Sequence, residues 1–255
     1  MRIDRKQRIC DLLKKGIETG DPSAVDVISP NQYIQHNPQT QTGREGLAAL
    51  FKRISKTSPR VNIVRIFSDG DYVFGHTEYD FSTSRIGFEV FRFEGDYTVE
   101  HWDNIQPRKG PNHSGHSMVD GPTEVADLQH TDANRECVRQ FVDAVLIGTD
   151  LTQLPSFVSA SYIEHNPDSS NGIEALRSTL NTYAPDGSLA VNYTQQHRIL
   201  AQGNFVLSVS EGFFAGEHTA FYDLYRLADG KIVEHWDTRE AVPPLDQWEN
   251  DNGKF

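Results

Sequence analysis

The pentapeptide Val-Glu-His-Trp-Asp occurs twice in the chain, at residues 99–103 and again at 233–237. Side chains of a β-strand alternate between its two faces, so the histidine and the aspartate of each copy share one face. A histidine beside a carboxyl group is a pairing that general acid/base catalysis uses, because one group donates a proton while the other accepts one. The first candidate catalytic residues are therefore His101, Asp103, His235 and Asp237.

The turn before each pentapeptide predicts a hairpin that adds a second carboxylate to this face. If the first hairpin is centred on its Glu-Gly-Asp turn, Glu89 lies opposite Asp103 and Phe91 lies opposite His101. The corresponding pairs in the second copy are Asp223 with Asp237 and Tyr225 with His235. Two carboxylates that lie close together raise the pKa of one of them, which suits proton transfer. A pair at a wet rim, or an aspartate that only orients the histidine, would fit the same pattern.

A second motif, Tyr-Ile-x-His-Asn-Pro, also occurs twice, at residues 33–38 and 162–167. Proline disfavours helix for the residue before it, so each motif is expected to form a turn. The histidine and the asparagine either close this turn through hydrogen bonds to the backbone or bind a ligand in a pocket. These candidate ligand-binding residues are His36, Asn37, His165 and Asn166, joined by Phe91 and Tyr225 of the hairpins.

The motifs recur in the same order, which indicates a duplicated domain. The His-Asn-Pro motifs are 129 residues apart and the pentapeptides 134 residues apart, a drift that an insertion near residues 184–188 explains. We predict repeats at residues 1–110 and 130–255, joined by a linker at 111–129 that is rich in Pro, Gly, Ser and His. The histidines in and beside the linker, His113, His116 and His130, are expected to be solvated rather than to form a metal clip.

Each repeat is predicted to begin with an amphipathic helix. Its apolar positions are Ile9, Leu12, Leu13 and Ile17 in the first repeat and Val138, Phe141, Val142, Val145 and Leu146 in the second, with Asp4 as a candidate N-cap of the first. A short second helix follows each His-Asn-Pro motif, and Thr42 with Glu45 and Asn171 with Glu174 have the spacing of capping boxes.

Four strands rich in β-branched and aromatic residues follow in each repeat. Helices followed by an antiparallel meander predict an α+β domain in which a curved, cone-shaped sheet wraps around the N-terminal helices. We expect the pentapeptide to end the central strand, the two tryptophans to lie in the core, and a small-molecule pocket to form at the open mouth.

Composition excludes several classes of partner. The formal net charge is −12 and the pI is about 5.2, which argues against nucleic acid because phosphate binding depends on Lys and Arg. No apolar run approaches the roughly 18 residues of a membrane span, and residues 1–21 are typical of an amphipathic helix rather than a signal peptide. We therefore expect a cytoplasmic protein without membrane contact. Cys10 and Cys137 are expected to be small apolar residues, since no metal-site spacing surrounds them.

The order of helix, Tyr-Ile-x-His-Asn-Pro, second helix, meander and Glu-His-Trp-Asp resembles the SnoaL-like polyketide cyclase branch of the NTF2-like superfamily, in tandem. The resemblance covers nearly the whole chain except the linker and residues from about 241 onwards. It implies two cone-shaped α+β domains and, for the cyclases, a cofactor-free aldol closure of a polyketide. The key acid of the cyclases falls on Asp103 and Asp237, whereas Glu89 and Asp223 stand where the cyclases have a histidine. It also implies that the repeats pair through their sheets as an internal pseudo-dimer, and a further homodimer is compatible with it.

The sequence leaves three functions open. The first is an enzyme without metal or organic cofactor that performs acid/base chemistry on a carbonyl-containing or polyketide-like substrate, as a cyclase, isomerase or dehydratase. The second is a protein that binds a small ligand without chemistry, and the third is a metal site formed by His36, His101 and a carboxylate. The repeats differ where Gln35 aligns with Glu164 and His76 with Val209, so one pocket could be active and the other structural.

Overall fold

The computed structural model describes residues 4–255, so the first three residues of the predicted N-terminal helix lie outside the described residues. The chain divides into two compact units. The first comprises the residues up to Pro107 together with Pro243–Phe255, and the second comprises Arg108–Val242. The predicted linker thus belongs with the second unit, and the C-terminal residues belong with the first unit rather than with the second repeat. Within residues 4–255, no helix is both long and apolar enough to cross a membrane.

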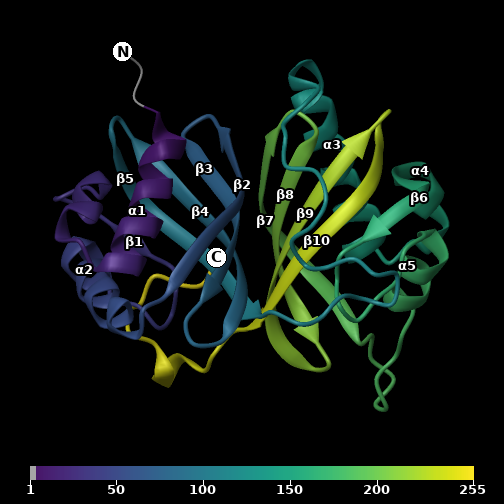
Figure 1. Ribbon diagram of the computed structural model, residues 1–255. Helices are drawn as coiled ribbons and strands as arrows, with labels where there is room; N and C mark the ends of the chain where they lie inside the picture. Colours follow the sequence, from purple (N-terminus) through teal and green to yellow (C-terminus); the bar gives the residue numbers. More distant parts are fainter. Residues whose placement is uncertain (1–3) are drawn as a thin grey trace. The chain divides into compact units, whose positions relative to one another are not determined.

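The first unit places its α-helices on one side of its sheet (Figure 1). Its helical segments are α1 (Arg5–Thr19), η1 (Pro22–Val27), α2 (Gly43–Ile54), η2 (Ser55–Thr57) and, near the C-terminus, η6 (Leu245–Gln247). Its strands are β1 (Ile34–Gln35), β2 (Arg60–Asp69), β3 (Tyr72–Asp80), β4 (Ser84–Glu94) and β5 (Tyr97–Pro107).

The second unit repeats this order of elements. Its helical segments are η3 (Leu128–His130), α3 (Thr131–Phe141), the π-helical η4 (Val142–Ile147), η5 (Leu151–Gln153), α4 (Leu154–Phe157) and α5 (Ile173–Leu180). Its strands are β6 (Val158–Glu164), β7 (Val191–Gln202), β8 (Phe205–Phe214), β9 (Glu217–Ala228) and β10 (Lys231–Ala241).

Each unit contains a five-stranded sheet, ordered β1-β5-β4-β3-β2 in the first and β6-β10-β9-β8-β7 in the second. Four strands form the predicted meander, and the fifth is contributed by the start of the Tyr-Ile-x-His-Asn-Pro motif, which pairs in parallel with β5 or β10. The pentapeptide strand is therefore second in the sheet and not central, and the pentapeptide lies within it and not at its end. The additional strand was not predicted because the proline of the motif indicates a turn, which begins only after the strand residues.

The predicted hairpin register is confirmed in both units. Glu89 pairs with Asp103 and Phe91 with His101. The equivalent pairs of the second unit are Asp223 with Asp237 and Tyr225 with His235. The alternation of side chains along these strands therefore gathers the predicted polar groups on one face of each hairpin.

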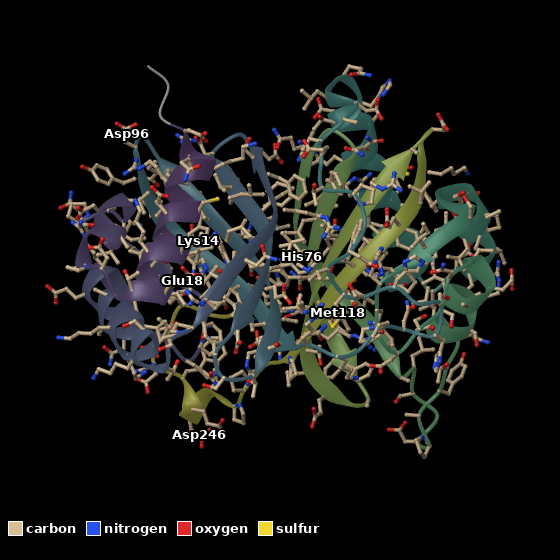
Figure 2. All side chains as sticks on the ribbon, viewed as in Figure 1. Lys14, Glu18, His76, Asp96, Met118 and Asp246 are labelled. Carbon is tan, nitrogen blue, oxygen red and sulfur yellow. The ribbon has the colours of Figure 1, made fainter. Side chains whose placement is uncertain are left out.

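The predicted first helices cover this face and complete the cores. Their predicted apolar residues are all buried, in one cluster with sheet residues in each unit. The Asp4 carboxylate caps α1 by accepting the N–H groups of Lys6 and Gln7. At the other end of α1, Glu18 (labelled in Figure 2) accepts the N–H of Val61 on β2 at 2.9 Å, which ties the helix to the sheet. Trp102 and Trp236 are buried, as expected.

The predicted capping boxes are wrong, although the helices that they were expected to begin are present. The N-cap of α2 is Thr42 and that of α5 is Gly172, and neither makes a side-chain capping hydrogen bond. Thr42 instead donates its hydroxyl to the carbonyl of Tyr33 at 2.8 Å, and Asn171 accepts the N–H of Glu164 at 3.0 Å. These side chains therefore hold the start of each helix against the parallel strand. They bond to this strand instead of capping the helix.

Candidate functional site

A cavity of about 330 Å³ opens between the helices and the sheet of the second unit. Its walls are mainly apolar and include Phe141, Leu176, Val191 and Ile232. Polar groups gather at one end, where His235, Asp237, Asp223, Glu164, Asn166 and Arg239 line it. A largely apolar cavity with a few convergent polar groups is typical of a site for a small organic molecule.

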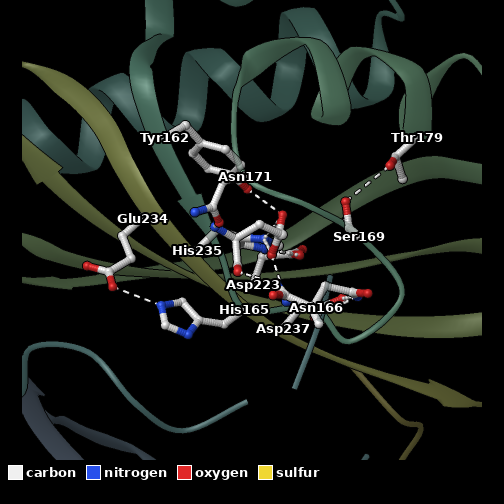
Figure 3. A network of polar contacts seen from close by, with 12 residues as sticks. Tyr162, His165, Asn166, Ser169, Asn171, Thr179, Asp223, Glu234, His235 and Asp237 are labelled. Carbon is white, nitrogen blue, oxygen red and sulfur yellow. Dashed lines mark hydrogen bonds and ion pairs between the residues drawn. The ribbon is translucent and has the colours of Figure 1, made fainter. Parts of the chain in front are cut away.

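His235 lies between two carboxylates at this polar end (Figure 3). Its Nδ1 is 3.0 Å from Oε1 of Glu164, and its Nε2 is 3.0 Å from Oδ1 of Asp223. Burial disfavours the charged ring, but Glu164 and Asp223 outweigh it and raise the pKa of His235 well above 6.5. Burial likewise works against the Glu164 carboxylate, yet the charge of His235 holds its pKa below the usual value. His235 is therefore an imidazolium with both N–H groups engaged.

Two tyrosine hydroxyls complete the set of donors around these carboxylates. Tyr162 donates to Oε2 of Glu164 at 2.6 Å, and Tyr193 lies 3.2 Å from both carboxylate oxygens of Asp223. Burial raises the pKa of both phenols well above 10, so each remains a protonated donor. The His235 ring and its two carboxylates thus form a fixed polar group rather than one free to exchange protons with a ligand.

Asp237 is the carboxyl group of the cavity that remains suited to proton transfer. Asn166 donates its Nδ2 to both carboxylate oxygens, at 2.9 and 2.7 Å, and Nε of Arg239 is 3.1 Å from Oδ2. Burial raises the pKa of Asp237, with further contributions from the negative charges of Glu164 and Asp223, against the opposing effect of Arg239 and His235. A raised carboxyl pKa brings the group closer to the neutral range in which general acids and bases work.

The cavity of the first unit is smaller, about 230 Å³, and its histidine has different partners. Nε2 of His101 is 2.7 Å from Oε2 of Glu89, and Nδ1 is 3.0 Å from Oε1 of Gln35. Gln35 also accepts the N–H of Asn37 at 2.9 Å, so its oxygen faces two donors. Burial raises the pKa of Glu89. The hydrogen bond and charge of His101 act in the opposite direction, and the negative charge of Asp103 raises the pKa further. His101 therefore faces one carboxylate and one amide, whereas His235 faces two carboxylates.

Asp103 of the first unit contacts a cation from the C-terminal segment. Asn37 donates to its Oδ2 at 2.7 Å, as Asn166 does to Asp237. Nζ of Lys254 donates to the backbone carbonyl of Asp103 at 2.9 Å and is 3.7 Å from its Oδ1. Each unit thus places one asparagine amide and one cation at the pocket aspartate, but the two cations come from unrelated parts of the chain.

The structure brings most of the predicted site residues together. Asp103, Glu89, His101, Asn37 and Phe91 line the cavity of the first unit, and Asp237, Asp223, His235, Asn166 and Tyr225 line that of the second. The aromatic partners stack on the histidines, with ring centroids 4.3 Å apart for Phe91 and His101 and 4.9 Å apart for Tyr225 and His235.

His36 and His165 lie elsewhere, because neither is among the residues that line the cavity of its unit. Nε2 of His36 is 3.0 Å from Glu100 and its ring stacks on Trp102, with centroids 4.6 Å apart. His165 likewise lies 2.8 Å from Glu234, and Figure 3 shows this pair apart from the His235 group. Glutamate and tryptophan alternate with histidine and aspartate along the pentapeptide strand, so they hold these rings on its opposite face. His36 therefore lies on the opposite face from His101, which argues against the metal site of these two histidines that the sequence left open.

Several residues of the two sites were not predicted. Arg239 follows the pentapeptide by two residues. Residues i and i+2 of a strand lie on the same face, so the sequence could have placed Arg239 beside Asp237. Its counterpart, 134 residues earlier, is Ile105, which lines the first cavity. In the first unit the hydroxyl of Tyr79 donates a hydrogen bond to Oε1 of Glu89 at 2.6 Å. The position of Tyr79 is taken by Gly212 in the second unit, and Tyr193, which pairs with Gly212 on the adjacent strand, supplies the hydroxyl instead.

Two groups of side chains among the described residues have the spacing of metal ligands. Glu89, His101 and Asp103 form one, inside the first cavity. His116, Asp120 and His165 form the other, in the second unit. Cys10 and Cys137 are free thiols and belong to neither group.

Comparisons with known proteins find similarity in structure. No family model matches the chain, and no curated protein matches it in sequence. A candidate ketosteroid isomerase from Kribbella flavida is 17% identical with a TM-score of 0.38, covering 45% of this chain and 84% of that one. A candidate polyketide cyclase from Acidithiobacillus ferrooxidans is 18% identical with a TM-score of 0.35, covering 42% and 92%. An NTF2-like protein of unknown function from Mesorhizobium loti is 18% identical with a TM-score of 0.34, covering 42% and 97%. Each match covers less than half of this chain. The α+β fold of two units is seen in the two five-stranded sheets and their helices.

Proposed function

We propose that the second unit is an enzyme that moves a proton on a small carbonyl-containing or polyketide-like substrate, using only its own side chains. Cyclisation, isomerisation and dehydration of such substrates all begin with removal of a proton from the carbon beside a carbonyl group. The observation that carries the proposal is Asp237, a buried carboxyl group with a raised pKa at the polar end of an apolar cavity.

The residues around Asp237 suit distinct parts of this step. The Asp237 carboxylate accepts the proton as the C–H bond breaks, and the electron pair moves to the carbonyl oxygen to give an enolate. Arg239 lines the cavity beside Asp237 and supplies positive charge for that oxygen. Return of the proton to another carbon completes an isomerisation. In an aldol cyclisation the enolate carbon instead attacks a second carbonyl, and the proton held by Asp237 passes to the alkoxide that forms.

His235 has a different role in the proposal from the one that its motif suggests. Both of its ring nitrogens face carboxylates at 3.0 Å, so it does not donate to a substrate oxygen. As a fixed imidazolium it offsets the charges of Glu164 and Asp223, which would otherwise raise the pKa of Asp237 further. It is a positioning residue, and Asp237 is the group that touches the substrate.

The first unit supports binding without chemistry as a second function. Its cavity has Ile105 where the second unit has Arg239, so no arginine side chain adjoins Asp103 on that strand. An enolate oxygen at that position would meet a methyl group, and Lys254, the cation beside Asp103, is not among the residues that line this cavity. We propose that this cavity holds a small apolar ligand and that the two units divide catalysis and binding.

Deuterium exchange of 2-tetralone, a bicyclic ketone, tests the proton-transfer step. Incubation in D₂O with the protein is expected to accelerate exchange of the protons beside the carbonyl over buffer alone, as followed by proton NMR. Asp237→Asn should reduce the accelerated rate by about 10²–10⁴-fold, the usual contribution of a general base. Asp103→Asn is the matched control in the first unit and should retain the rate. Equal rates for wild type and Asp237→Asn would refute the proposal, and loss only in Asp103→Asn would move the chemistry to the first unit.

A further inference from the structure

Three metal-binding side chains meet on the second unit, on the opposite face of β10 from the cavity. They are His116 and Asp120, from the segment between the repeats, and His165, from the second His-Asn-Pro motif. One ligand atom from each lies within 4.8 Å of the others. We propose that these residues form a binding site for a divalent transition-metal ion such as zinc.

The contacts of His165 provide the first support. Its Nε2 is 2.8 Å from Oε1 of Glu234, and its Nδ1 is 2.7 Å from Oδ1 of Asp120 and 2.8 Å from the carbonyl of Ser117. Nδ1 of His165 thus faces an oxygen of Asp120, the second proposed ligand, and the ring is held from its other side by Glu234. A carboxylate on the outer nitrogen of a metal-bound histidine is also a recurrent arrangement in metal sites.

Glu234 is itself held in place for this role. It is 2% exposed and accepts Nε of Arg226 at 2.6 Å. The side chain of His165 is 1% exposed, so its ring has little freedom to turn away. The buried half of the proposed site is thus fixed by groups that do not themselves bind the ion.

The segment that supplies the other two ligands is folded by its own hydrogen bonds. Oδ1 of Asn112 accepts the N–H groups of Ser114 and His116, and Nδ2 of Asn112 donates to the carbonyl of Glu164 at 2.6 Å. Oγ of Ser117 accepts the N–H of Asp120 at 3.2 Å. Met118 of the same segment is buried (Figure 2). The loop therefore presents His116 and Asp120 to His165 from a defined conformation.

The first unit provides an internal comparison. His36 is the counterpart of His165, and its ring nitrogens face Glu100 and the carbonyl of Gly253. Within residues 4–255, no second histidine or aspartate joins His36 in a group with metal-ligand spacing. The second unit has the same histidine and glutamate together with two further ligands, which is what a metal site requires.

The ligand chemistry identifies the class of ion. Two imidazole nitrogens and one carboxylate oxygen suit zinc and its neighbours nickel and copper, whereas magnesium and calcium prefer oxygen ligands throughout. The side chains of His116 and Asp120 are 31% and 46% exposed, so an ion can enter and water can complete its coordination. Because the site faces away from Asp237, the ion would fasten the segment to the second unit without entering the proton-transfer step.

Zinc titration of the tag-free, chelator-treated full chain tests the proposal. We expect one zinc ion per chain to bind at this site by isothermal titration calorimetry and elemental analysis, and magnesium not to compete. His116→Ala and Asp120→Ala should each weaken zinc binding by at least about tenfold, because mutating even a residue that only hydrogen-bonds to a metal ligand weakens binding by that amount. His113→Ala is the matched control, an exposed histidine of the same loop outside the group, and should bind zinc as the wild type does.

Both test residues are partly exposed, so circular dichroism is expected to show an unchanged fold in each variant. Zinc affinity that is equal in wild type, His116→Ala and Asp120→Ala would overturn the proposal. Zinc that survives both changes and is lost in Asp103→Asn would lie in the first cavity, with Glu89 and His101, and would overturn it as well.

Discussion

A single position distinguishes the histidines of the two cavities. Gln35 faces His101 in the first unit, and Glu164 faces His235 in the second. Exchange of an amide for a carboxylate adds one negative charge at 3.0 Å from the ring. That charge, with Asp223, raises the pKa of His235 despite its burial, and in the proposed function it leaves Asp237 as the group that moves protons.

Glu164→Gln is therefore expected to lower the pKa of His235. The native pKa of this histidine is raised above its ordinary value of 6.5, so its contribution to stability is complete below about pH 6.5. The contribution is lost as the pH rises through the native pKa, at up to about 1.4 kcal/mol per pH unit. In Glu164→Gln the loss should occur at lower pH. NMR titration of the His235 ring between pH 6 and 10 measures its pKa, and Glu174→Gln, a change at an exposed glutamate of α5, is the control. An unshifted titration would contradict the electrostatic account.

At the scale of elements, two unrelated segments perform the same task in the two units. The carbonyl of Gly253, in the C-terminal segment, contacts Nδ1 of His36 at 2.7 Å. The carbonyl of Ser117, in the segment between the repeats, contacts Nδ1 of His165 at 2.8 Å. Each segment therefore contacts the histidine of the His-Asn-Pro turn of the unit to which it belongs.

The C-terminal segment should become mobile when its asparagines are removed. Asn250 donates to the carbonyls of Asn37 and Thr40, and Asn252 donates to that of Gln35, at 2.8–2.9 Å. Loss of three hydrogen bonds at about 1 kcal/mol each should weaken attachment of the segment by roughly 3 kcal/mol. Asn250→Ala with Asn252→Ala should increase hydrogen exchange in residues 33–42 and 249–255. Asp246→Ala, in the same segment, is the control. Unchanged exchange at 33–42 would show that the turn holds without the segment.

At the scale of the whole molecule, the chain contains two separate hydrophobic cores. The cluster of the first unit includes Leu12 and Phe91, and that of the second includes Phe141 and Tyr225. Because each cavity is enclosed by the helices and sheet of a single unit, each site depends on the core of its own unit. The pairing of the units as an internal pseudo-dimer stays a prediction.

Phe141→Ala tests how independent the cores are. Truncation of a fully buried phenylalanine typically costs about 3–5 kcal/mol, and Phe141 is 2% exposed in the second core. We expect hydrogen exchange to increase in β6 to β10 and to stay unchanged in β1 to β5. Leu12→Ala is the reciprocal variant and should affect only the first unit. An equal increase in both units would instead indicate one cooperative body, the behaviour of a tightly paired pseudo-dimer.

The sequence by itself determined the duplication, the α+β class, the meander and the register of the hairpin that contains the pentapeptide. These features follow from local regularities: a repeated motif, a period of two in strands, a period near four in helices and a turn of known length. The same alternation pairs Asp103 with Glu89 and Asp237 with Asp223, as observed in both sheets.

Only the tertiary structure decided which histidines line the cavities and which cation accompanies each aspartate. His36 and His165 lie beyond a proline turn, so no strand periodicity relates them to the pentapeptide, and their partners Gly253 and Ser117 are distant in sequence. Lys254 reaches Asp103 across 151 residues. Such contacts depend on where loops fold back, and loops carry no period from which the sequence can place them.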